Sequence, residues 1–211
     1  MTAPSDKAAG PLLLDLATVT VLITALVYFT GWTYAYHYFG HFKLGLLTLE
    51  IPTEYFFVYG FWVFKRWWWL IVPYALVILL LMVYEPRLSP WLDKCRTERP
   101  RLLKQLQVLM VLLAFLLAWL LASVSAGWYY QEQQDNGFLA YPHVRVWPNT
   151  PLPEDAGLRE LYGELPNGVY RLLLENRETL FLFKLPSDGK PARLPVIELP
   201  LSEVKLLRVL P

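Results

Sequence analysis

Cysteine and charged residues are scarce in this sequence. The single cysteine, Cys95, cannot form an intrachain disulfide, and no pair of cysteines is present to build a zinc site. Charged residues make up 18% of the chain, against roughly 25% in an average soluble protein. The formal net charge of +1 gives no reason to expect a nucleic-acid partner. The composition therefore argues against a disulfide scaffold, a cysteine-based metal site and a nucleic-acid-binding protein.

The short motifs that accompany nucleotide binding and hydrolysis are also missing. The sequence contains no P-loop, no G-x-G-x-x-G, no G-x-S-x-G and no H-E-x-x-H. We therefore expect neither catalytic residues nor a cofactor, and we interpret the chain as a non-enzymatic protein.

Apolar side chains, in contrast, make up 55% of the chain, and the charges are unevenly spread. Residues 1–129 hold seven of the 18 acidic and ten of the 19 basic residues, and most of these lie in two clusters. The remainder of the chain has the charge balance of an ordinary soluble domain. This contrast predicts a short cytoplasmic N-terminus at 1–10, a transmembrane domain at 11–129, a linker at 130–168 and a small β domain at 169–211.

Three stretches approach the length of about 20 apolar residues that is needed to cross a bilayer. These predicted spans cover residues 11–33, 67–84 and 106–127. A fourth apolar stretch, residues 52–64, is too short to cross, and we interpret it as a re-entrant or interfacial segment. The predicted fold class is an α-helical integral membrane protein with about three transmembrane helices and a small C-terminal antiparallel β domain.

The loop at residues 85–104 is basic, and such loops remain in the cytoplasm under the positive-inside rule. The N-terminus would then also be cytoplasmic, and the C-terminal domain periplasmic or extracellular. This topology predicts a multi-pass protein of a cell membrane, and a bacterial inner membrane fits best. The topology-setting residues are Arg87, Lys94, Arg96, Arg99, Arg101 and Lys104.

Aromatic side chains gather at one end of each predicted span. Trp and Tyr rings prefer the level of the lipid headgroups, so the clusters indicate a shared depth in the membrane. The predicted interface anchors are Trp32, Trp67, Trp68, Trp69, Trp128 and Tyr129.

The span at 106–127 carries a small residue at every fourth position. This spacing places small side chains on one ridge, where a second helix backbone can approach closely, within the protomer or between protomers. The predicted helix-packing residues are Ala114, Ala118, Ala122 and Ala126.

Two pairs of potential metal ligands lie between the first two predicted spans. His37 and His41 are four residues apart, as are Glu50 and Glu54. Imidazole and carboxylate groups at this spacing could hold zinc or a similar cation. The same side chains could instead lie in the hydrated headgroup region, and because this interpretation is favoured, no metal is predicted.

The C-terminal part has the pattern of short strands separated by turns. Strands are predicted at 169–174, 179–184, 193–199 and 204–209, and the first two should form a hairpin. A further strand at 143–147 interrupts the predicted linker, in which several prolines exclude a continuous helix.

The function predicted from these features is that of a membrane subunit, anchor or scaffold that presents an extracytoplasmic β domain to a partner. Its partners would be the lipid bilayer and a protein, which could be a second copy of this chain. A first alternative is a homo-oligomeric channel or membrane-disrupting effector, which needs self-association because three helices cannot enclose a pore alone. A second alternative is an interfacial metal-dependent enzyme that uses the histidine and glutamate pairs.

Overall fold

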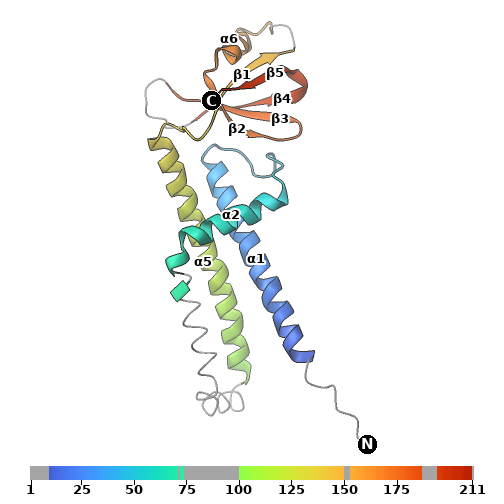
Figure 1. Cartoon of the computed structure of the whole chain (residues 1–211), viewed down its shortest axis with the longest axis vertical. Helices are drawn as coiled ribbons and strands as arrows, with labels where there is room; N and C mark the ends of the chain where they lie inside the picture. Colours follow the sequence, from blue (N-terminus) through green and yellow to red (C-terminus); the bar gives the residue numbers. More distant parts are fainter. Residues whose placement is uncertain (1–9, 71, 74–99, 150–152, 187–193, 211) are drawn as a thin grey trace, which may run out of the picture. The chain divides into compact units, whose positions relative to one another are not determined.

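The computed structural model describes residues 10–70, 72–73, 100–149, 153–186 and 194–210. The described elements are, in chain order, α1 (Gly10–Gly40), α2 (Thr53–Arg66), α5 (Pro100–Asp135), β1 (His143–Pro148), α6 (Ala156–Glu164), the 3-10 turn η1 (Leu165–Asn167), β2 (Tyr170–Glu175), β3 (Thr179–Lys184), β4 (Val196–Pro200), the 3-10 turn η2 (Leu201–Glu203) and β5 (Val204–Val209) (Figure 1). They divide into two compact units. The first lies within Met1–Ala35 and Pro52–Ala126, and the second within Tyr36–Ile51 and Gly127–Pro211.

The helices α1 and α5 are long and apolar. By length and composition, Ala17–Gly40 and Val111–Asp135 could each cross a membrane, and the described part of the chain holds these two such segments. Both helices extend beyond the ends of the predicted spans, at residues 33 and 127. No proline lies between these positions and the helix ends at Gly40 and Asp135, and glutamine and glutamate in the last turns of α5 are good helix formers.

The predicted second span, residues 67–84, lies mostly outside the described residues. Within it, residues 68–70, 72 and 73 are helical. The aromatic stretch before it forms α2, a helix of 14 residues that begins directly after Pro52. Proline is tolerated at such a position because the first amides of a helix have no intrahelical acceptor.

In the first unit, α2 crosses α1 at very short range (Figure 1). A Cβ atom added to Gly31 of α1 would lie 1.6 Å from the backbone oxygen of Phe56, and one added to Gly60 of α2 would lie 2.2 Å from the backbone oxygen of Val27. The aromatic ring of Tyr28 packs edge-on against Phe56, with ring centroids 5.6 Å apart. The crossing therefore depends on two residues without side chains.

The second unit contains a five-stranded antiparallel sheet with the strand order β4-β3-β2-β1-β5. The strands β2 and β3 form the predicted hairpin. Its turn is closed by the Asn176 side chain, which accepts hydrogen bonds from the backbone amides of Glu178 and Thr179 at 3.0 and 2.6 Å. The strand β1 lies between β2 and β5, so β4 and β5 form the two edges.

The two faces of the sheet have different coverings. Successive side chains of a strand point to opposite faces, so each strand contributes to both. One face, here called the helix-covered face, carries Val144, Tyr170 and Leu182, which pack with Leu165 of η1 and with partly buried side chains of α6. The opposite face, here called the junction face, carries the residues that alternate with these, Phe183 among them.

The region predicted as a linker, residues 130–168, contains several regular elements. It holds the last turns of α5, the strand β1 and the helix α6. The prolines between 142 and 153 prevent one continuous helix, as expected, but α6 begins after the last of them. Its N-cap residue Asp155 accepts a hydrogen bond from the backbone amide of Leu158 at 3.0 Å.

Candidate functional site

An aromatic cluster joins the sheet to the ends of the two long helices within the second unit. The ring of Phe138 lies at its centre, with its centroid 5.4 Å from Phe183 on the junction face, 5.7 Å from Tyr130 of α5 and 6.1 Å from Phe42. The ring of Tyr141 lies 5.5 Å from that of Phe183. We call these five residues the aromatic junction. Its members Phe42, Phe138 and Phe183 are buried.

The last turns of α1 and α5 meet beside this cluster. The ring of Tyr38 in α1 lies 5.5 Å from that of Tyr129 in α5, and the hydroxyls of Tyr38 and Tyr141 are hydrogen-bonded to each other. Both helix ends therefore belong to the same packed unit as the sheet. A sheet attached by a flexible tether would not share a core with the helices that precede it.

The turn after α5 has an unusual backbone that the aromatic junction supports. Gly137 and Phe138 have φ angles of 61° and 55°, in the left-handed region that side chains disfavour. The amide of Phe138 donates to the carbonyl of Gln133 at 2.6 Å, and that of Gly137 to the carbonyl of Gln134 at 3.0 Å, which caps the helix. Burial of the phenyl ring offsets the backbone strain at Phe138.

A buried arginine attaches the sheet to this turn. Arg171 of β2 is 7% exposed, and its Nη1 atom donates to the carbonyls of Phe138 and Tyr141 at 2.9 and 2.6 Å. Burial lowers the pKa of the Arg171 guanidinium. Among the described residues no carboxylate pairs with it, so two backbone carbonyls provide its main polar contacts.

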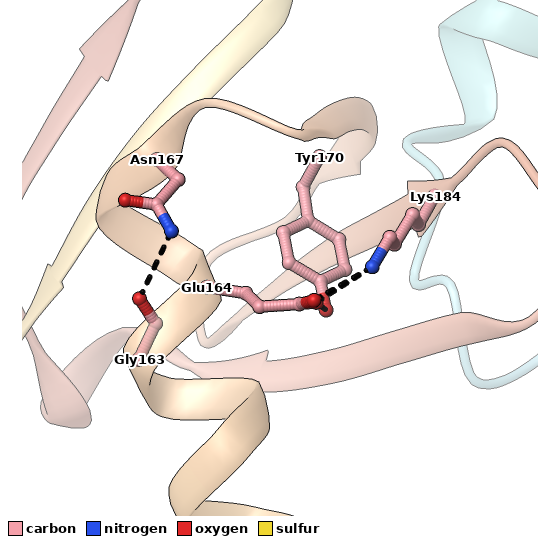
Figure 2. Close-up of polar contacts among 5 residues, drawn as sticks. All are labelled: Gly163, Glu164, Asn167, Tyr170 and Lys184. Carbon is pink, nitrogen blue, oxygen red and sulfur yellow. Dashed lines mark hydrogen bonds and ion pairs between the residues drawn. The ribbon is translucent and has the colours of Figure 1, made fainter. Parts of the chain in front are cut away.

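A polar cluster closes the other side of the sheet (Figure 2). The carboxylate of Glu164 lies between the Lys184 ammonium, 2.8 Å from both oxygens, and the Tyr170 hydroxyl, which donates at 3.0 Å. The hydrogen bond from Lys184, followed by that from Tyr170, lowers the pKa of Glu164. Burial, with the nearby carboxylate, raises the pKa of Tyr170 to about 12. The cluster holds α6 and η1 onto strands β2 and β3 and has the character of a structural clamp.

The alanines predicted as a packing ridge lie on a largely buried side of α5. Ala118, Ala122 and Ala126 are buried, and Ala114 is half-buried. The ring of Phe115, next to this row, lies 5.3 Å from Phe29 of α1, so α1 and α5 are in contact in the first unit.

The predicted interface anchors have different environments. The indole N–H of Trp67 donates to the hydroxyl of Ser125 at 2.8 Å, which ties the end of α2 to α5. Tyr129 is half-buried at the end of α5. The other four are exposed on the surface of the described chain: Trp32, Trp68, Trp69 and Trp128.

The structure does not assemble the four potential metal ligands into a site. Among the described residues, no group of three or more histidine, cysteine, aspartate or glutamate side chains is arranged to hold a metal ion. His41 instead stacks on Tyr130, with ring centroids 4.4 Å apart. Burial, and secondarily the neighbouring His37, lowers the pKa of the His41 imidazole.

Most of the predicted topology-setting residues lie outside the described residues. These topology-setting residues are Arg87, Lys94, Arg96 and Arg99. The single cysteine, Cys95, also lies outside the described residues. Arg101 and Lys104 fall in the first turns of α5.

Sequence reasoning missed Arg171, the Glu164 clamp and the two glycines of the helix crossing. The clamp joins residues far apart in the sequence, and no local pattern marks it. Gly31 and Gly60 did carry a signal, because each lies inside an otherwise aromatic and apolar segment where glycine weakens a helix unless close packing requires it.

Comparison with protein-family models, curated protein sequences and solved structures found no match to this chain.

Proposed function

We propose that this protein is a multi-pass membrane subunit, anchor or scaffold that holds its β domain at the membrane surface and presents it to a protein partner. The observation that carries this proposal is the aromatic junction. Through it, the sheet shares one packed unit with the last turns of both helices that could cross a membrane. Such an arrangement suits a domain that is held at a fixed place on its anchor.

The proposal includes a topology. The basic loop at 85–104 favours a cytoplasmic N-terminus and a periplasmic or extracellular β domain, and a bacterial inner membrane suits the absence of glycosylation sequons. A thiol reagent that cannot cross membranes should miss Cys95 in intact spheroplasts and label it after permeabilisation. An Arg177→Cys variant that lacks Cys95 should be labelled in both, because Arg177 is exposed in the β2–β3 turn. If Cys95 were labelled in intact spheroplasts and the thiol in the β domain only after permeabilisation, the topology would be the inverse of the proposed one.

The presented surface of the domain can be tested by photo-crosslinking in cells. A crosslinking amino acid at Leu158 of α6, which is 49% exposed, should yield an adduct with a second protein. The same substitution at Val21 of α1, which is 67% exposed, provides a control inside the candidate span. A self-assembled channel or effector would give a different result. Val21 would then form adducts with a second copy of the chain, Leu158 would form none, and light scattering would show a defined homo-oligomer.

A further inference from the structure

The part of the junction face that strands β1 and β5 form is basic. Arg145 of β1 and Arg208 of β5 are exposed and directly opposite each other in the register of the two strands. The next pair on this face is Trp147 with Leu206, of which Leu206 is 56% exposed. Two guanidinium groups, an indole and an isobutyl group therefore share one side of two neighbouring strands. We call these four residues the basic patch.

The arginine pair is unfavourable for the sheet itself. Residues directly opposite have Cβ atoms about 4.5–5.5 Å apart, and like charges at that distance repel. No carboxylate among the described residues pairs with either arginine. Charges often protect an edge strand from unwanted pairing. That explanation covers Arg208 on the edge strand β5 but not Arg145, because β1 lies inside the sheet.

The orientation of the junction face follows from its covered half. Phe183 packs on Phe42 and Phe138, which lie two and three residues beyond the ends of α1 and α5. The junction face thus looks toward the segments that leave the two candidate spans. Strands in a sheet twist by roughly 20–25° per neighbour, so β1 and β5 still look broadly the same way as β2.

We propose that the basic patch binds the phosphate groups of anionic lipids in the leaflet that surrounds the two spans. Guanidinium groups match phosphate in a bidentate geometry, and tryptophan and leucine suit the interfacial region beside it. Juxtamembrane arginines are each attracted to anionic surfaces by an amount that corresponds to roughly a fivefold change in binding. The lipid phosphates would then offset the repulsion between the two arginines. This inference rests on the proposed membrane location of the β domain.

The test uses the full-length protein in nanodiscs of phosphatidylcholine alone or of phosphatidylcholine mixed with phosphatidylglycerol. A polarity-sensitive dye is attached to Leu206→Cys in a chain without Cys95. We expect the emission to shift to the blue in the anionic discs, and the shift to vanish at high salt because screening weakens exposed charge pairs. The double variant R145Q/R208Q should lose the shift. The matched control R177Q, which removes an exposed arginine from the β2–β3 turn, should keep it.

A separate measurement shows that the double variant is folded. Because R145Q/R208Q removes a repulsive pair, its thermal midpoint in neutral detergent should equal or exceed that of the unmodified chain. An equal emission in both kinds of disc, or a shift that survives in the folded double variant, would overturn the inference. If soluble polyglutamate produced the blue shift in neutral discs, the inference would also be overturned, because the ligand would then be an acidic protein segment. If alkaline carbonate released the protein from membranes, the proposed function itself would fail.

Discussion

Gly31 and Gly60 let α1 and α2 cross with their backbones in contact, because a Cβ on Gly31 would lie 2.8 Å from the backbone nitrogen of Gly60. Close approach of the two backbones permits many dispersion contacts between the helices, and these contacts hold the crossing together. The crossing is therefore stable because neither glycine has a side chain that would keep the two backbones apart.

Alanine at Gly31 should separate the two helices. The new methyl group would lie 1.6 Å from the Phe56 carbonyl oxygen, which is backbone and cannot rotate away. Overpacking usually costs 1–3 kcal/mol, so we expect a loss of at least about 2 kcal/mol, measured by denaturation in mild detergent. Gly60→Ala should behave alike. Gly127→Ala is the control, because among the described residues no atom outside the local helix backbone lies within 4 Å of its added Cβ, and it should stabilise α5 by up to about 1 kcal/mol. Equal effects at all three positions would contradict this account.

The alanine row on α5 makes a second packing prediction. Leucine at Ala118 or Ala122, which are 4% and 0% exposed, should force neighbouring helices apart at a cost of about 1–3 kcal/mol each. Leucine at Ala25, an exposed position of α1, is the matched control and should change the thermal midpoint little. Unchanged stability in Ala118→Leu would mean that the row tolerates bulk and does not act as a packing surface.

Arg171 should be essential for the turn that joins α5 to the sheet. Arg171→Met keeps much of the side-chain volume but removes the donor from the Phe138 and Tyr141 carbonyls. Removing the buried charge relieves some desolvation, but the loss of two charge-assisted hydrogen bonds outweighs it, and we expect a net loss of about 1–3 kcal/mol. Hydrogen exchange should rise at residues 136–142. Arg177→Met, an exposed control, should leave exchange there unchanged, and a similar rise in both variants would refute the role.

The sequence predicted the elements that depend on local patterns. Long apolar runs identified α1 and α5, and the alternating segments with polar turns identified the strands of the C-terminal sheet. The helix α6 was missed although Leu158, Leu161, Tyr162 and Leu165 have helical spacing after the capping residue Asp155. The prolines that precede α6 predicted a linker, because proline interrupts helices, although this helical spacing begins only after the last of them.

The position of β1 between β2 and β5 could not be predicted in the same way. Its register places Val144 against Tyr170 on one side and Val209 on the other, residues that are far along the chain. Long-range pairing leaves no periodic signal in one sequence. The pairing of Arg145 with Arg208, and that of Arg171 with His143, could therefore not be predicted before the strand order was known.

The Glu164 clamp predicts a stability that declines at both ends of the pH range. The pKa of Glu164 is lowered by Lys184 and Tyr170 from its ordinary value of 4.5, so its contribution is complete above pH 4.5 and is lost as the pH falls through the lower folded value. The pKa of Tyr170 is raised from 10.0 to about 12, so its contribution is complete below pH 10 and is lost as the pH rises toward 12.

Two variants should separate these contributions. Glu164→Gln removes the carboxylate, so the decline in thermal midpoint between neutral and acid pH should become shallower. It should also weaken the alkaline decline, because Glu164 helps to raise the pKa of Tyr170. Tyr170→Phe should mainly flatten the alkaline decline, whereas Tyr36→Phe, at a residue that is 54% exposed, should not. Circular dichroism of the full chain in detergent gives the midpoints. If Tyr170→Phe left the alkaline decline as steep as before, the hydroxyl of Tyr170 would not be the group that titrates, and the clamp would owe its strength to the Lys184 ion pair alone.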